Sequence, residues 1–297
     1  MSIVRAPPAR GEQRRGKQPK VAIFGVGRVG GALAVGLVRA GWDVFVVPRS
    51  RDSRRRASAL GLPVAEPGAL GAASICILAV PDPAVSSVAR ELDERLPPRV
   101  ALVHCAGGLT LTALIRGAKT KARPLGSFHP LCAVSDPRDD LTGQAVALSA
   151  THAKLGALLW RMASALRLTP LAVPESGRGA YHAGAVLAAG GLVALASSAA
   201  SAWARAGIGE RKATDALVSL MRSAIRGIER RGLREALTGP IARGDWQMVE
   251  RHLKQLPREA REVYLSLAEQ ALRLAAGSVS KRERRLVSEV LRRWRKR

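Results

Sequence analysis

Three glycines near the start of the chain have the spacing of a phosphate-binding turn. They follow an apolar run at 21–25 and open a stretch of helical pattern. In such a turn the first glycine permits the tight bend, the second lets a pyrophosphate approach the backbone, and the third lets helix and strand pack closely. Free N–H groups at the helix N-terminus then hold the phosphates. The segment expected to bind the phosphates is Gly25, Val26, Gly27, Arg28, Val29 and Gly30. The alternative is a glycine-rich turn that binds no ligand.

The end of the second expected strand indicates which nucleotide this turn would bind. Pro48 is followed there by Arg49, Ser50 and Arg51, and the Asp or Glu that would bind the ribose hydroxyls of NAD is missing. A 2′-phosphate would instead meet two guanidiniums and a hydroxyl, which bind phosphate through charge-assisted hydrogen bonds. The pattern predicts NADP(H), unless the two arginines only begin a solvent-exposed helix.

Two more strand ends are expected at the same edge of the sheet, because ligands of open α/β sheets bind beyond the carboxyl ends of the strands. Val80 and Pro81 end the strand expected at 74–80, and His104 ends the one at 99–105. We expect these three residues to line the nicotinamide side of the cofactor. For His104, a role as a hydrogen-bonded structural histidine is an equal alternative.

The apolar runs that position these residues alternate with helical segments up to residue 150, as parallel α/β folds require. Strands are expected at 21–25, 43–48, 62–65, 74–80, 99–105, 122–128 and 145–149, and helices near 29–40, 52–60, 82–96 and 109–119. Beyond 151, one strand at 169–173 is expected among helices at 152–167, 178–206, 209–231, 245–255, 257–276 and 281–296. The sequence therefore predicts an α/β Rossmann domain with a mainly parallel, doubly wound sheet, followed by a mainly α-helical C-terminal domain.

The charge is concentrated at the two ends of the chain. Residues 1–20 carry six Lys and Arg against one Glu, and residues 281–297 carry nine against two Glu, so the ends supply +12 of the net +25. Because the rest is spread thinly, nucleic acid is not the expected partner. We expect a disordered basic arm at 1–20, the NADP-binding domain at 21–150, the helical domain at 151–280 and a basic amphipathic helical tail at 281–297. The apolar face of that tail is expected to pack on the body, with a membrane-surface or partner helix as the alternative.

Other features of the composition narrow the class of protein. Cys76, Cys105 and Cys132 form no CxxC pair, so neither a disulfide framework nor a metal site is expected, and a reducing cytoplasm fits best. The segment 183–204 carries no charge and is long enough to span a bilayer. Ala, Gly and Ser dominate it, which favours a helix buried in the core or in a dimer interface. We expect no integral membrane segment.

Six motifs, in this order, carry a resemblance to a known family: GVGRVG at 25–30, LAVPD at 78–82, HCAGG at 104–108, SFHP at 127–130, YHAGA at 181–185 and TGPIARGD at 238–245. Over 20–280 the chain resembles Rossmann-like proteins whose C-terminal half is domain of unknown function 2520. These are relatives of pyrroline-5-carboxylate reductase, ketopantoate reductase and the hydroxyisobutyrate dehydrogenases. The resemblance implies a C-terminal domain like that of 6-phosphogluconate-dehydrogenase-type enzymes, homodimerisation through it, and an active site between the domains.

The resemblance also bears on the catalytic groups. Reductases of the wider group carry Lys and Asn four residues apart on a helix, where Lys donates a proton and Asn orients the substrate. The comparable helix here has His182, Val186 and Gly190, so the amide positions are lost and one titratable group is kept. An imidazole can replace the lysine as general acid, and His129 is the second candidate for that role. For both, a packed structural role is the alternative.

Substrate contacts are expected from Ser127 and Tyr181, which lie beside these histidines in the sequence, and from Arg243. Arg243 would clamp a substrate carboxylate, but the 238–245 turn could equally cap and orient two helices. The leading hypothesis is an NADP(H)-dependent oxidoreductase that moves a hydride between the nicotinamide and a small carbonyl, imine or hydroxy-acid substrate. The rival is a non-catalytic NADP(H)-binding protein with a structural or redox-sensing role, which the missing amides keep open.

Overall fold

The computed structural model describes residues 2–3, 18–115 and 123–296. The chain forms two compact units, Met1–Ala189 and Gly190–Arg297. Of the basic arm expected at 1–20, only 2–3 and 18–20 are among the described residues. The first unit extends past residue 150, where we expected the Rossmann domain to end, because the segments that follow pack on its sheet.

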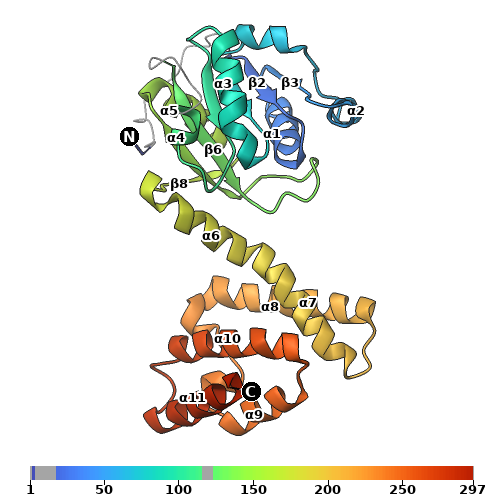
Figure 1. Ribbon diagram of the computed structural model, residues 1–297, viewed down its shortest axis with the longest axis vertical. Coiled ribbons are helices and arrows are strands. Elements are labelled where there is room, and N and C mark those ends of the chain that lie inside the picture. The colour runs from blue at the N-terminus through green and yellow to red at the C-terminus, as the bar shows by residue number, and fades with distance from the viewer. Residues whose placement is uncertain (1, 4–17, 116–122, 297) are drawn as a thin grey trace. The chain divides into compact units, whose positions relative to one another are not determined.

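The first unit is built on one mostly parallel sheet, ordered β1-β7-β6-β5-β4-β2-β3, with β8 paired to β7 (Figure 1). Only β7 runs antiparallel to its neighbours β6 and β1. From β2 the chain continues to β3 on one side and then to β4 on the other, which makes the β2/β4 boundary the switch point where such sheets bind ligands. The strands are β1 (Ser2–Ile3), β2 (Val21–Phe24), β3 (Val44–Val47), β4 (Ile75–Leu78), β5 (Ala101–His104), β6 (Leu125–Leu131), β7 (Ala145–Ala150) and β8 (Thr169–Leu171).

Helices cover both faces of this sheet, which confirms the doubly wound architecture. Val21 and Ile23 of β2 pack in one cluster with residues of α1 (Arg28–Arg39) and α5 (Ala153–Ala165). Ala22 and Phe24, which point the other way, pack with residues of α3 (Val85–Arg95) and α4 (Thr112–Ile115). Because successive side chains of a strand point to opposite faces, these fully apolar strands are the expected pattern for a sheet buried on both sides.

Two expected elements differ from the structure. In 62–65 only Val64 pairs, through an isolated bridge to Val46, so the strand expected there is wrong. Pro63 has no N–H to donate to a ladder, and the chain turns into a 3₁₀ helix at Pro67–Ala72 soon afterwards. The helix expected at 109–119 is described only over α4, since 116–122 lie outside the described residues.

A buried arginine fixes the start of β6. Arg123 is 2% exposed, and its Nε donates to Asp93 Oδ1 at 2.5 Å. Its other nitrogens donate to the carbonyls of Leu96 and Val100 at 2.8 and 2.7 Å. The guanidinium therefore ties the last turn of α3, and the loop after it, to the segment that enters β6.

The second unit is entirely helical in its described residues, which confirms the expected class. Its helices are α7 (Gly190–Ala204), α8 (Glu210–Glu235), α9 (Trp246–Gln255), α10 (Arg258–Leu274) and α11 (Lys281–Arg295). Val287, Leu291 and Trp294 of α11 are buried against Val249 of α9 and Leu272 of α10. The apolar face of the last helix thus packs on the body of this unit, as its sequence pattern indicates.

Burial of 183–204 in the core of the chain, the first of the two alternatives expected for it, is wrong for the described residues, and burial in a dimer interface stays a prediction. This segment falls in two helices, α6 (Arg178–Ala188) and α7, which meet at Ala189, and none of its residues is buried. Val193 is 71% exposed and Leu187 75%. By length and composition Glu175–Ala204 is the one described helical stretch that could span a membrane, with a mean hydropathy of 1.7 over its most apolar window. Within the described chain α7 packs on α8 and α10, but apolar side chains such as Val193 remain on its outer surface.

Candidate functional site

The glycine turn lies at the switch point and leaves room for a ligand. Gly25 has a φ of +101°, and a Cβ there would stand 2.5 Å from the carbonyl oxygen of Ala79, the residue after β4. A Cβ on Gly30 would overlap the Gly25 carbonyl oxygen, so helix α1 approaches the turn as closely as its sequence predicts. Val80 borders the turn, and a Cβ on Gly27 would meet nothing within 4 Å.

The N-terminus of α1 is also suited to an anion. Gly27 is its N-cap residue and supplies no side chain to bond the free N–H groups of Arg28 and Val29. A pyrophosphate beside Gly27 would accept those bonds at the positive end of the helix dipole. The turn therefore fits the phosphates of a dinucleotide.

The segment after β3, where the ribose of the nucleotide is expected to bind, has more guanidinium groups nearby than the sequence suggested. Arg49 is exposed and lies over the Phe24 ring, 5.6 Å from its centroid. Ser50 caps α2 (Arg51–Ala59), its hydroxyl accepting from Ser53 N at 3.1 Å, which engages it in the fold. Arg56, which sequence reasoning missed, donates to the Val26 carbonyl at 2.7 Å and so lies over the glycine turn. The helix expected over this segment could have indicated Arg56, because Arg56 lies about one turn after the residues that begin α2.

His104 takes a structural position. Its side chain is fully buried, and Nδ1 accepts from Ala106 N at 3.2 Å. Burial, followed by the nearby Arg178 charge, lowers the pKa of His104 to about 4. The ring is therefore neutral at neutral pH and shapes the loop after β5 without reaching the surface. Of its two readings, the structural one fits these contacts.

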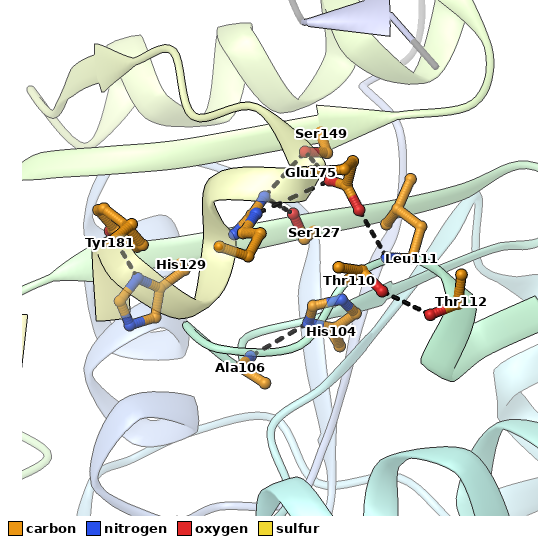
Figure 2. Close-up of polar contacts among 11 residues, drawn as sticks. His104, Ala106, Thr110, Leu111, Thr112, Ser127, His129, Ser149, Glu175 and Tyr181 are labelled. Atoms are coloured by element: carbon orange, nitrogen blue, oxygen red, sulfur yellow. Dashed lines mark hydrogen bonds and ion pairs between the residues drawn. The ribbon is translucent and has the colours of Figure 1, made fainter. Parts of the chain in front are cut away.

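Both candidate catalytic histidines lie in the first unit, close together, although we expected His182 in the second domain. His129 of β6 and His182 of α6 have ring centroids 6.1 Å apart, in an edge-to-face arrangement. Nδ1 of His129 shares a hydrogen bond of 2.8 Å with the Tyr181 hydroxyl, toward which its ring points in Figure 2. His182 Nδ1 is buried and makes no hydrogen bond within the described part of the chain.

The two imidazoles meet at the glycine pair that follows β5. A Cβ on Gly107 would stand 2.6 Å from His182 Nδ1 and 2.7 Å from His129 Nε2, and one on Gly108 would stand 3.2 Å from the His182 ring. Any side chain at Gly107 would displace both rings. Because β2, β4, β5 and β6 run parallel, this cluster lies at the same sheet edge as the glycine turn.

His129 is neutral at neutral pH. Burial, then His182 and Arg178, lowers the pKa of His129 to about 4. A buried ring close to the Arg178 guanidinium resists protonation, which argues against His129 as the general acid that the sequence offered as its second candidate. If the Tyr181 hydroxyl donates to Nδ1, the neutral ring carries its proton on Nε2, facing Gly107.

A buried ionic cluster beside this pair was not predicted from the sequence. Arg178 is fully buried, and its Nη2 donates to Ser127 Oγ and Ser149 Oγ at 2.5 and 2.8 Å. Glu175 accepts from Ser149 Oγ at 2.7 Å and from Leu111 N at 2.9 Å (Figure 2). Ser127 is 1% exposed and bonded to Arg178, so the substrate contact expected of it does not fit its position.

The remaining candidates are separate from this cluster. Pro81 follows β4 and is exposed. Arg243 is exposed in the second unit, in a 3₁₀ turn that ends at Gly244, and Asp245 caps α9 by accepting from Met248 N at 3.0 Å. The 238–245 turn thus has the helix-capping role that was the alternative for it. No three His, Cys, Asp or Glu side chains of the described ranges group as metal ligands.

Family comparisons agree with this geometry. A model described as NADP oxidoreductase coenzyme F420-dependent matches residues 20–108, and one described as a domain of unknown function (DUF2520) matches residues 145–271. The chain joins an NADP-binding Rossmann domain to a DUF2520 domain. The DUF2520 match begins at the start of β7 and so includes α6, with Tyr181 and His182. No curated protein matches the sequence.

Solved structures share the fold at low sequence identity. A candidate NADP oxidoreductase from Bacteroides fragilis is 21% identical, with a TM-score of 0.72 over 86% of this chain and 98% of its own. A 1-pyrroline-5-carboxylate reductase from Streptococcus pyogenes is 17% identical, with a TM-score of 0.64 over 86% and 99%. An imine reductase from Pseudomonas is 19% identical, with a TM-score of 0.59 over 92% and 99%. These structures show the shared fold, and the two family models confirm the resemblance carried by the six motifs.

The arginines at the ribose end make cofactor preference testable. We expect NADPH to bind at least tenfold more tightly than NADH, which is about 1.4 kcal/mol and within reach of charge-assisted phosphate contacts. Replacing Arg49 and Arg51 together with Ala should remove the preference, whereas Arg55→Ala should keep it, since Arg55 is exposed and pairs only loosely with Asp52 at 3.9 Å. Fluorescence titration with both nucleotides measures this. Equal affinities in the unmutated protein would contradict it.

Burial of His104 predicts a dependence of stability on pH. Its pKa in the fold, about 4, is below the ordinary value of 6.5, so the unfolded chain binds the proton better and stability is lost as pH falls from 6.5 through about 4. His104→Asn keeps an acceptor for Ala106 N–H but cannot titrate. Between pH 7 and pH 4 the unmutated protein should lose on the order of 2 kcal/mol more unfolding free energy than this variant. Urea unfolding at both pH values measures the difference, and parallel losses would refute it.

Proposed function

We propose that this protein is an NADPH-dependent reductase of a small substrate with a C=O or C=N bond, and that His182 supplies the proton. The observation that carries the proposal is the meeting of the His129 and His182 rings at Gly107, on the sheet edge that also holds the glycine turn. A reduction of this kind needs a hydride and a proton delivered to adjacent atoms. This edge brings a nucleotide-binding turn and two imidazoles together within one unit.

Each group of residues has a separate task. The turn at 25–30 and the guanidiniums of Arg49, Arg51 and Arg56 would hold the nucleotide, whose nicotinamide supplies the hydride when it is bound. His182 would donate the proton to the oxygen or nitrogen of the substrate. The neutral His129, fixed by Tyr181, would orient the substrate through Nε2. Since burial lowers the pKa of His129 to about 4, that ring is neutral at neutral pH, which leaves His182 as the proposed donor.

The relatives support an imine or carbonyl substrate. Two of the solved structures that share this fold are named as reductases of an imine and of 1-pyrroline-5-carboxylate. Their identity to this chain is below 25%, so the substrate of this chain is inferred from their names only as a class. A panel of cyclic imines, short aldehydes and 2-oxo acids covers that class and the hydroxy-acid direction.

The proton donor can be tested by removal. His182→Gln should leave NADPH affinity nearly unchanged, because the residue lies on α6 and not on the glycine turn. Turnover should fall by roughly 10²–10⁴-fold, the usual contribution of a positioned proton donor. The measurement is NADPH absorbance with a substrate found in the panel.

His129→Gln is the matched variant for this test. It should raise KM more than it lowers kcat, because a residue that orients the substrate acts on binding. Full turnover by His182→Gln would exclude it as the donor. Tight NADPH binding with no turnover on the whole panel would favour the rival, a non-catalytic NADP(H)-binding protein.

We also propose that a second copy of the chain covers the exposed apolar surface of α7. This helix carries no charged side chain, and Leu192 and Val193 are 36% and 71% exposed. A homodimer would bury that surface without a membrane, in keeping with a cytoplasmic protein.

Light scattering of protein purified without detergent should give twice the 31.4 kDa chain mass. Replacing Val193 with Glu should shift the mass toward one chain; a monomer in the unmutated protein, or recovery only from membranes, would overturn the proposal.

A further inference from the structure

The proposed reduction leaves Arg178 without a role, although it is the most completely buried charged side chain near the histidine pair. Its exposure is 0%, and one nitrogen, Nη2, donates to two serine hydroxyls at once. Nε lies 3.7 Å from Glu175 Oε1, close enough for attraction but too far for a hydrogen bond. A charge in this position is costly to bury, so its contacts need an explanation.

The spacing of those contacts links two elements at two levels. On α6, Tyr181 lies three residues after Arg178, on the same face of the helix. On β6, His129 lies two residues after Ser127, on the same face of the strand. Arg178 bonds Ser127, and Tyr181 bonds His129. The two contacts are about one helical turn apart on α6 and two residues apart on β6. Together they fix the register of α6 against β6.

A third contact brings in the loop that carries Gly107. Glu175, one turn before Arg178, accepts from the backbone N–H of Leu111 at 2.9 Å. The loop between β5 and Leu111 contains Gly107, against which both imidazoles rest. The pair of Glu175 and Arg178 therefore contacts both β6, which carries His129, and the segment that follows β5.

We propose that Arg178 is a positioning residue, which sets the register of α6 on β6 and so holds His129 and His182 together against Gly107. The inference rests on the proposed function for its catalytic meaning, but the arrangement it describes can be measured in the resting protein.

The charge of Arg178 acts on the pair as well. The groups that face His129 are Tyr181, His182 and Arg178, all from α6. Arg178 lowers the pKa of His129 and also that of His104 on β5, after the larger effect of burial in both cases. The Arg178 guanidinium therefore adds to the effect of burial and of His182 in disfavouring the charged form of His129.

The test separates the charge of Arg178 from its shape. Arg178→Met removes both, whereas Arg178→Lys keeps the charge on a shorter side chain whose ammonium does not reproduce the position and planar geometry of the guanidinium. Histidine titrations by NMR, with the exposed Arg90→Met as control, should show the pKa of His129 raised by about one pH unit in Arg178→Met and nearly unchanged in Arg178→Lys and in the control. Ser127→Ala, which breaks only one of the two contacts, should shift the His129 ring signals at pH 7 without raising its pKa.

Turnover gives a second readout. Arg178→Lys and Ser127→Ala should each lower kcat at least tenfold while the Kd for NADPH stays unchanged, because the glycine turn is independent of this cluster. An unchanged His129 pKa in folded Arg178→Met, or unchanged ring signals in Ser127→Ala, would overturn the inference. If Arg178→Met does not fold, the ring signals and kcat of the other two variants decide it. Failure to find any substrate would count against the proposed function alone, since the NMR results do not require one.

Discussion

The buried guanidinium of Arg178 is the contact on which the site depends most. Removing a charge from water costs several kcal/mol, and only good geometry and satisfied partners offset that cost. Here Nη2 bonds serines of β6 and β7, and Glu175 before α6 lies within ion-pair distance, while Nε and Nη1 make no hydrogen bond within the described residues. The same contact that stabilises this part of the fold also determines where Tyr181 and His182 can be. The guanidinium of Arg178 and its partners therefore serve both the stability of the fold and the position of the proposed catalytic residues.

Local patterns in the sequence were sufficient for most of the fold and for the nucleotide turn. At Gly25 and Gly30 the backbone passes so close to neighbouring atoms that no side chain fits. This closeness is a local property of a strand–turn–helix unit, so the sequence pattern can show it. The alternation of apolar runs and helices likewise predicted the order of strands and helices from β2 to α11. The failure at 62–65 has a local cause too, because a proline in a short apolar run argues against a strand.

The ionic cluster could not be predicted in this way. Arg178 is one of 48 basic residues, and no spacing distinguishes it from those on exposed helices. Its partner Ser127 is 51 residues away and was read as a substrate contact, since a polar residue beside a histidine is typical of either role. The neutral state of His129 was missed for the same reason, because burial and neighbouring charge are properties of the folded chain.

The arrangement around β7 has a consequence for how this chain behaves among its copies. Its face toward β6 is paired along the whole strand, while on the outer side β1 pairs with Ser149 and Ala150, and β8 with 145–147. Two short strands from distant parts of the chain thus pair with the outer side of β7, where another molecule could otherwise bind its backbone N–H and C=O groups. An open edge is a template for strand addition and aggregation. Along β7 these two segments, Ser2–Ile3 and Thr169–Leu171, occupy the positions that a strand from another molecule would take, so the chain limits strand addition to β7 by pairing with itself.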